Sequence, residues 1–325
     1  MHKLPFELVE REILIKKDAE TDPELGCFPY ERSVPELLEK GVINLNKPKG
    51  PTSHMVADYV KKIFKARKAG HGGSLDPGVT GVLPIGLNRA TAVLQALLTA
   101  GKEYVAIMHL HDDFPEDKIR AVMRDFVGEI TQLPPKKSAV KRVERKRTVY
   151  YLDIIEIDGR DVLFRMGCQA GTYVRRLCDD IGKKLGSHSH MAELVRTKAG
   201  PFNDADWVSL QDLEDAFALF KEDGDERFLR HCVKPMEFAV SHLPKIWVLD
   251  NAVDSLAHGA PLHIPGIAKL HSGIKTGDSV AVMTLKDELV ALAVAMMPSA
   301  QMLKQDRGLA ARSSRVLMET GVYKS

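Results

Sequence analysis

An aspartate in a glycine-rich loop is the part of this chain best suited to chemistry. Residues 70–92 read GHGGSLDPGVTGVLPIGLNRATA, with glycines on both sides of Leu75-Asp76-Pro77. Pro77 fixes its own φ and favours extended backbone at Asp76, while glycines leave room for a ligand near the main chain. The pattern predicts a carboxylate on a preset loop, able to act as nucleophile or base. The alternative is that Asp76 only caps a turn, as Asp before Pro often does.

The flanking sequence predicts the elements that position this loop. Apolar spacing and capping residues indicate helices at 34–40, 53–66, 88–98, 117–127, 172–185 and 208–221, with Asn88 and Thr172 as N-caps. Buried strands are expected at 42–46 and 103–110, and a hairpin at 148–157 and 161–168 turns at Asp158-Gly159. Because helices and strands follow no regular βαβ rhythm, we expect an α+β fold with a mixed sheet.

The length of 325 residues predicts more than one domain. From about residue 241 the segments become short, with strand-like runs at 279–283 and 289–295 between glycine turns. We therefore divide the chain into an N-terminal extension at 1–33, a main domain at 34–240 and a small strand-rich domain at 241–325. The main domain contains the aspartate loop.

Composition narrows the functional classes. The chain is 44% hydrophobic and 28% charged with a net charge of +2, which is typical of globular proteins. Its four cysteines form no C-x-x-C pair, so neither a zinc site nor a disulfide framework is expected. The charged N-terminus contains no signal-peptide core, and no run is long enough to cross a membrane. We expect a cytoplasmic protein without a bound metal.

One strongly basic segment stands out against the balanced total charge. Residues 136–147 read KKSAVKRVERKR, with seven basic residues and one acidic. Such a run is often only a solvated surface. Its position after Pro134-Pro135, between a helix and a strand, is also that of an exposed loop able to bind phosphates.

Residues 70–84 resemble the signature loop of the TruB-type RNA pseudouridine synthases, G-H-x-G-[ST]-L-D-P-x-x-x-G-V-L-P. The resemblance implies that Asp76 is the catalytic nucleophile in the isomerisation of uridine to pseudouridine. That reaction breaks an N-glycosidic bond, turns the base over and rejoins it through carbon, so no cofactor is required. Which atom Asp76 attacks stays open.

Two further motifs supply partners for Asp76 by the same resemblance. Tyr104, in Lys102-Glu103-Tyr104, matches the tyrosine on which the displaced base stacks. Arg175 lies in GTYVR, where the family arginine pairs with the catalytic aspartate. A guanidinium binds a carboxylate through two donors and does not deprotonate, so this pair would keep Asp76 ionised and oriented. Without the resemblance, the simplest interpretation of Tyr104 is a packed strand residue. Arg176, next to Arg175 in the sequence, is interpreted as facing RNA or solvent.

Three supporting residues are predicted to contact the substrate. His71 matches a loop histidine beside the displaced nucleotide, although a local hydrogen-bonding role fits it equally well. Leu194 matches a pocket-wall leucine; Val195 follows where the family has arginine, so one phosphate contact is missing. Lys47 lies in NKPKGPTS, a motif that braces the loop, and is the one residue there assigned to substrate binding.

The resemblance also covers the basic segment and the C-terminus. The basic run matches an RNA-gripping loop, which assigns Lys141, Arg142, Arg145 and Arg147 to RNA binding. The fragments HGAPLHIPGI, KTGDSVAVMT and RGLAARSSRVLM resemble a PUA domain, a small β-barrel-like RNA-binding module. The extension at 1–33 is expected to pack on that domain, as it does in the family.

The lead-in VPELLEKGVINLNKP, the strand KEYVAIMHLH and the PUA-like end are similar to the catalytic subunit of H/ACA ribonucleoproteins, in its short archaeal form. This implies an H/ACA guide RNA that selects uridines in rRNA. It also implies three protein partners: a short subunit on the catalytic domain, a β-barrel subunit and a kink-turn RNA-binding protein. A stand-alone synthase acting on the tRNA T-loop is the alternative, and both activities can coexist. A non-catalytic RNA-binding scaffold is a third reading, which the intact Asp76, Tyr104 and Arg175 disfavour.

Overall fold

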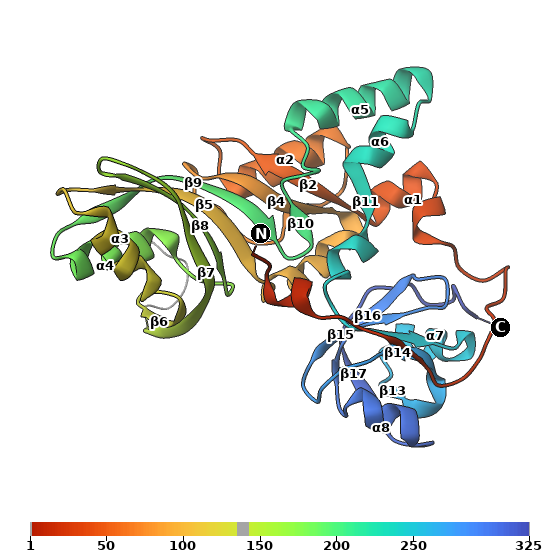
Figure 1. The fold of residues 1–325 in the computed structure, drawn as a ribbon. Helices are drawn as coiled ribbons and strands as arrows, with labels where there is room; N and C mark the ends of the chain where they lie inside the picture. The colour runs from red at the N-terminus through yellow and green to blue at the C-terminus, as the bar shows by residue number, and fades with distance from the viewer. Residues whose placement is uncertain (1, 135–142, 325) are drawn as a thin grey trace.

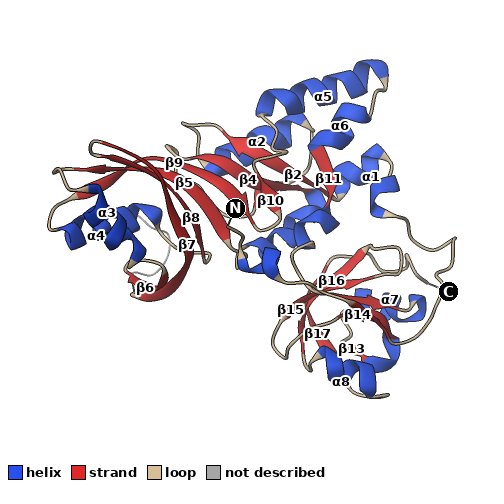
Figure 2. Cartoon of the chain, viewed as in Figure 1, coloured by secondary structure: helices blue, strands red, loops and turns tan. Residues whose placement is uncertain are grey.

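The computed structural model describes residues 2–134 and 143–324, and its two sheets divide the molecule (Figure 1). Within these residues the larger sheet has ten strands and the smaller has seven. The larger sheet curls away from the smaller one, and helices cover its outer parts (Figure 2). The expected α+β class with a mixed sheet is confirmed, since antiparallel ladders dominate and β4 pairs with β9 in parallel.

The larger sheet forms the centre of the main domain. Its described strands are, in spatial order, β11 (Val233–Pro235), β2 (Gly41–Lys47), β4 (Thr80–Leu87), β9 (Ser189–Ala199), β5 (Lys102–Leu110), β8 (Asp161–Cys168), β7 (Arg145–Asp158) and β6 (Gly128–Gln132), with β10 (Phe202–Asn203) beside β9 and β3 (Ala69–His71) beside β4.

The helices around this sheet match most of the expected ones. They are η2 (Pro29–Glu31), α1 (Val34–Glu39), α2 (Ser53–Ile63), η3 (Asn88–Leu97), α3 (Glu116–Arg124), α4 (Val174–Leu185), α5 (Leu210–Asp223), α6 (Arg227–Cys232) and η4 (Met236–Val240). The apolar stripe of α4 packs Leu177, Cys178 and Ile181 into one core with Met108, Phe164 and other buried residues of β5 and β8. This packing fixes the start of α4 against the sheet.

Two expected caps are wrong, for local reasons. The helix after the glycine loop is a 3-10 helix that begins after Leu87, and Asn88 has a φ of 44°. The Asn88 side chain instead accepts hydrogen bonds from the backbone N–H groups of Arg67 and Lys68. Thr172 donates its hydroxyl to the carbonyl of Gln169, and Tyr173 is the N-cap of α4.

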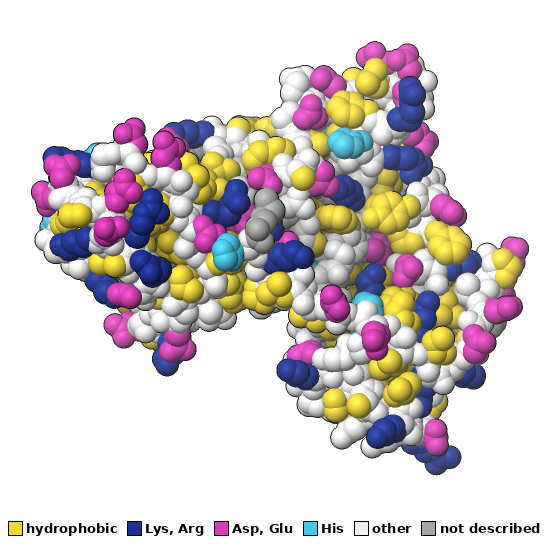
Figure 3. Space-filling view, in the orientation of Figure 1, with side chains coloured by type: hydrophobic (Ala, Val, Ile, Leu, Met, Phe, Trp, Pro, Cys, Tyr) yellow, Lys and Arg dark blue, Asp and Glu magenta, His cyan; other side chains and the backbone are white. Residues whose placement is uncertain are grey.

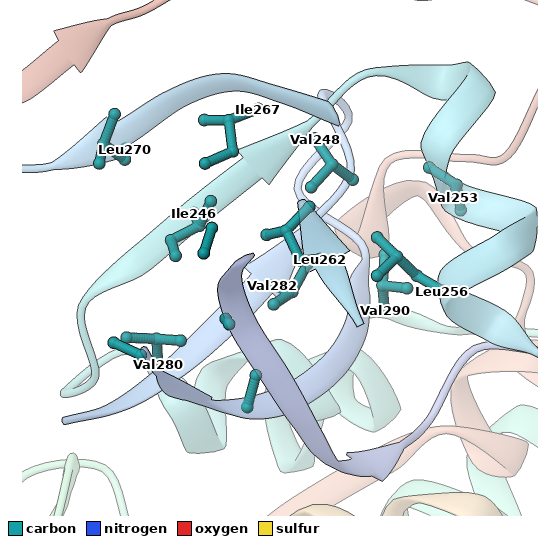
Figure 4. Packing of buried hydrophobic residues seen from close by; sticks show 14 of the residues in the cluster. Ile246, Val248, Val253, Leu256, Leu262, Ile267, Leu270, Val280, Val282 and Val290 are labelled. Atoms are coloured by element: carbon teal, nitrogen blue, oxygen red, sulfur yellow. The ribbon is translucent and has the colours of Figure 1, made fainter. Parts of the chain in front are cut away.

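The smaller sheet belongs to the C-terminal part of the chain. In spatial order its described strands are β1 (Ile13–Ile15), β14 (Ile267–His271), β12 (Lys245–Val248), β15 (Ser279–Met283), β16 (Leu289–Ala295), β17 (Leu309–Val316) and β13 (Leu262–His263). Helices α7 (Asp250–Ala257) and α8 (Ser299–Lys304) and the short η5 (Ile264–Gly266) accompany it. Figure 4 shows the apolar side chains that fill this sheet's interior, among them Ile246, Val282 and Val290.

The N-terminal segment contacts both sheets. Strand β1 extends the smaller sheet by pairing with β14. Before it, in η1 (Pro5–Leu8), Glu7 pairs with Lys198 of β9 at 2.9 Å, and Leu4 is fully buried against the larger sheet. The N-terminus therefore lies beside the central strands in Figure 1, and the segment links the two parts of the molecule.

Candidate active site

Asp76 and Arg175, 99 residues apart in sequence, form an ion pair. The Arg175 Nη2 lies 2.5 Å from the Asp76 Oδ2. Asp76 occupies the loop between β3 and β4, and Arg175 lies in the first turn of α4, which the apolar stripe of that helix holds in place. Both side chains are more than half exposed, at 60% and 58%, so the carboxylate is open to an incoming ligand.

Lys47 and Ser53 hold the loop around Asp76 in place through hydrogen bonds to its backbone. Lys47 is fully buried, and its ammonium donates to the carbonyls of Pro48, Pro77 and Val79 at 2.8, 3.2 and 2.9 Å. Burial lowers the pKa of Lys47, and the charge of Asp76 partly offsets that effect. The Ser53 hydroxyl bonds both the N–H and the C=O of Leu75. Lys47 thus supports the loop and does not reach the surface where RNA would lie.

Tyr104 and Leu194 line the site from two adjacent strands. They lie on β5 and β9 and belong to the same apolar cluster as Leu75 and Val79 of the Asp76 loop. Leu194 is buried, whereas Tyr104 is partly exposed. Burial raises the pKa of Tyr104, and Asp76 is near enough to raise it further. The structure therefore brings Asp76, Arg175, Tyr104 and Leu194 into one region.

His71 lies on β3, at the entrance to the same loop. Burial lowers its pKa, and the charges of His54 and Arg196 act in the same direction, so the imidazole is neutral at pH 7. Its Nδ1 is buried and has no hydrogen-bond partner within the described residues. A buried ring nitrogen without a partner is uncommon, and this one lies on the strand that leads into the Asp76 loop.

The basic segment lies only partly within the described residues. Lys141 and Arg142 fall outside them, whereas Arg145 and Arg147 begin β7 opposite Gln132 and Ile130 of β6. The Arg147 guanidinium lies over Gly171, where an added Cβ would be 3.1 Å from its Nε, so Arg147 adjoins the GTYVR motif. Basic and acidic side chains are intermixed over the face shown in Figure 3.

Sequence reasoning missed one charged residue of the site, Arg196. Its side chain is 2% exposed and lies beneath the Asp76 loop, beside Tyr104. The sequence carries a partial signal for it, because side chains two apart on a strand share a face and Leu194 is predicted to line the pocket. By contrast, Arg176 pairs with Asp179 and Asp180 on its own helix, away from Asp76.

Comparison with known families identifies the class of protein. The N-terminal domain model of the TruB family pseudouridylate synthases matches residues 61–117 and 111–174, and the C-terminal domain model of tRNA pseudouridylate synthase B matches 175–241. A DKCLD domain matches residues 1–57 and a PUA domain matches 244–317. The chain belongs to the TruB family and is an RNA pseudouridine synthase, an isomerase.

Relatives similar over nearly the whole chain place it more closely. Proteins named "Probable tRNA pseudouridine synthase B" from Methanopyrus kandleri and Pyrococcus abyssi are 56% and 57% identical, covering 99% and 97% of this chain and 95% of each relative. Among solved structures, a Cbf5-Nop10-Gar1 complex contains a chain with a TM-score of 0.95 and 55% identity, covering 99% of this chain and 98% of that one.

A second solved chain, from an H/ACA RNP bound to a substrate RNA containing 2'-deoxyuridine, has a TM-score of 0.92 and 53% identity, with 99% of both chains covered. This chain is thus similar throughout to archaeal Cbf5, and the C-terminal PUA domain is confirmed. Within the described residues, no helix is long and apolar enough to span a bilayer.

Proposed function

We propose that Asp76 is the nucleophile of uridine isomerisation, oriented by Arg175, and that the displaced base stacks on Tyr104. The observation that supports this most is the 2.5 Å ion pair at an exposed rim, beside a tyrosine and a leucine from adjacent strands. In the reaction the N1–C1′ bond breaks and a C5–C1′ bond forms, while C5 loses a proton and N1 gains one. Electrons balance without an oxidant or reductant.

The site must also receive a base that normally lies inside folded RNA. Extruding a nucleotide costs a few kcal/mol, and stacking on an aromatic ring recovers about 1–3 kcal/mol. Tyr104 is partly exposed, and Leu194 belongs to the same apolar cluster. His71 is partly exposed, so the exposed part of its ring would contact the nucleotide, while its unpaired Nδ1 is buried.

We further propose that a guide RNA selects the uridine, as part of an H/ACA ribonucleoprotein in the cytoplasm that acts on rRNA. Similarity across the whole chain to proteins solved with Nop10, with Gar1 and with substrate RNA supports this assembly. Its partners would be a Nop10-like short subunit, a Gar1-like β-barrel subunit and a kink-turn RNA-binding protein. The names of the relatives favour a second activity, direct modification of the tRNA T-loop.

Pseudouridine detection on two RNAs separates these activities. One RNA is a target strand paired to an H/ACA guide and the other is a bare tRNA, each incubated with and without the partner proteins. Guide-dependent function predicts product in the paired target that disappears when the guide is scrambled. Product on bare tRNA alone, with no response to guide or partners, would contradict the assembly proposal and leave the tRNA activity.

A further inference from the structure

Arg196 is a buried cation in the sheet directly below the proposed catalytic loop. The β5–β9 ladder pairs Glu103 with Lys198 and then Tyr104 with Arg196, so Thr197 is an extra residue, a β-bulge. Bulges re-aim side chains and are frequent beside active sites. Without this bulge Tyr104 would face Thr197. The bulge therefore places Arg196 opposite the base platform.

Strand β4, next to β9, leaves room for the backbone of Arg196. On its other side Arg196 pairs with Gly81 of β4. A Cβ at Gly81 would lie 2.3 Å from the Arg196 carbonyl oxygen, and the φ of Gly81 is 103°, so only glycine fits there. Gly81 belongs to the same signature loop and strand as Asp76, and its missing side chain allows the close approach of the arginine backbone.

The guanidinium connects three parts of the site. Its Nε donates to the Val82 carbonyl at 2.7 Å, and its Nη2 donates to the Gly73 carbonyl at 3.1 Å, three residues before Asp76. A side-chain hydrogen bond and the positive charge of Arg196 also act on the Tyr104 hydroxyl, lowering its pKa against the effect of burial. One side chain thus contacts both the loop that presents the carboxylate and the ring proposed to hold the base.

Within the described residues Arg196 is a buried charge whose partners are backbone carbonyls and Tyr104. Burial lowers the pKa of Arg196, and Tyr104 is the group that offsets this, rather than a carboxylate. Nearby Lys102 is buried as well, and burial together with Arg196 lowers its pKa to about 7. A buried charge without a carboxylate partner costs stability, and the hydrogen bonds to the Val82 and Gly73 carbonyls offset part of that cost.

We propose that Arg196 is a positioning residue that locks the Asp76 loop and the Tyr104 ring into one geometry for the reaction. This inference rests on the proposed roles of Asp76 and Tyr104. Misplacement of a reacting group by about 1 Å can cost about 10²-fold in rate. We therefore expect Arg196 to affect the rate of the reaction without contacting the RNA, since its side chain is buried.

The first test compares single-turnover rates and RNA affinity in three variants. Arg196→Met should slow pseudouridine formation about 10²-fold while the Kd for RNA stays within about threefold of wild type. Arg196→Lys, which keeps the charge but has one donor group, should recover part of the rate. The matched control is Lys198→Met on the same strand, whose side chain pairs with Glu7 outside the site and whose rate should be unchanged. Equal rates for Arg196→Met and the control would overturn the proposal.

The second test measures the electrostatic coupling between Arg196 and the Tyr104 hydroxyl in the absence of RNA. Tyr104 is replaced by 3,5-difluorotyrosine, and its ionisation is followed by ¹⁹F NMR. The groups that act on this hydroxyl are Arg196 from β9, Cys168 from β8 and Asp76 from the loop. Losing Arg196 should move the midpoint to higher pH, in the Lys variant by less than in the Met variant, and Lys198→Met should not move it.

An unmoved midpoint in both Arg196 variants would disprove the coupling, whatever the activity. If Arg196→Met fails to fold, the Arg196→Lys variant decides alone. A slower rate with a raised Tyr104 midpoint would support the proposal, and wild-type values of both would contradict it. Should Asp76→Asn remain active, the proposed function fails while the ¹⁹F result still stands. The two failures are therefore distinguishable.

Discussion

The ion pair between Asp76 and Arg175 contributes orientation more than stability. Exposed ion pairs contribute a net ~0–1 kcal/mol to stability, after the cost of ordering the two side chains. What the pair provides is a carboxylate aimed in one direction, on a loop whose backbone carbonyls are tied to the buried ammonium of Lys47. At the residue scale, removal of the charge should therefore affect chemistry and leave folding intact.

Asp76→Asn should abolish pseudouridine formation while the Kd for RNA and the unfolding midpoint remain near wild type. The amide keeps the size of the side chain but is not a nucleophile under these conditions. Single-turnover assays with a long incubation measure the residual rate, and Lys49→Gln, at a surface pair with Glu193, is the control. Product at a rate near wild type in the Asn variant would remove Asp76 from the nucleophile's role.

At the scale of elements, a buried histidine lies at the junction between the two sheets. His242 follows η4, is 7% exposed and contacts the ring of Phe6 from the N-terminal segment. Burial lowers its pKa to about 4, from a usual 6.5. Between pH 6.5 and 4 the unfolded chain binds a proton that the folded chain does not, so stability falls as the pH drops through this window.

The expected loss from His242 alone is at most about 3 kcal/mol between pH 7 and pH 4. Urea unfolding at pH 7 and pH 4.5 would measure it. His242→Phe, which keeps an aromatic ring against Phe6, should lose less stability on acidification than wild type does. The same acid loss in the Phe variant and in a surface control, His263→Gln, would show that His242 does not carry the effect.

At the scale of the whole molecule, one buried arginine joins the three parts of the chain. Arg32 of the N-terminal segment forms two hydrogen bonds with Glu237 of η4, at 2.8 and 2.9 Å, and lies 3.7 Å from Glu288 in the turn between β15 and β16. All three side chains are at most 8% exposed. An apolar cluster including Val42, Phe202, Trp247 and Leu292 packs the same two sheets together.

Arg32→Ala should destabilise the protein by about 3–5 kcal/mol, because it leaves two carboxylates buried without their partner. Denaturant unfolding would measure this, with Arg67→Ala as the control. Arg67 pairs with Glu39 at the surface and is 79% exposed, so its loss should cost less than about 1 kcal/mol. Similar losses of unfolding free energy in the two variants would show that Arg32 does not hold the three parts of the chain together.

The basic segment is expected to bind RNA phosphates outside the active site. Neutralising Lys141, Arg142, Arg145 and Arg147 together should weaken RNA binding and flatten its salt dependence. Each lost phosphate contact reduces the slope of log K against log salt by roughly 0.7–0.9. Filter binding from 50 to 200 mM salt checks this, and an unchanged slope would remove the segment from the interface.

Motifs within short windows predict three residues that the fold brings close together. Asp76, Tyr104 and Arg175 were chosen from three separate strings, and the structure brings them into one region. Arg196 shares a strand face with Leu194, but its place opposite Tyr104 depends on a bulge that forms only when β5 and β9 pair. Sequence reasoning missed strand β4, since its glycines read as loop until neighbours on both sides supply its hydrogen bonds. Asn88 was misread as a cap because its side chain bonds residues 21 and 20 positions back.

The sequence by itself determined the residues proposed to carry the chemistry, namely a carboxylate on a preset loop, an arginine that pairs with it and a tyrosine nearby, and it also indicated the PUA domain. Those properties are local, since residue type and backbone preference carry them. Tertiary structure decided which residues work together. Strand register placed Arg196 against Tyr104, burial turned Lys47 from a candidate RNA contact into a support of the Asp76 loop, and packing of α4 brought Arg175 across 99 residues to Asp76. Such relations depend on which surfaces are buried together, and no short window contains them.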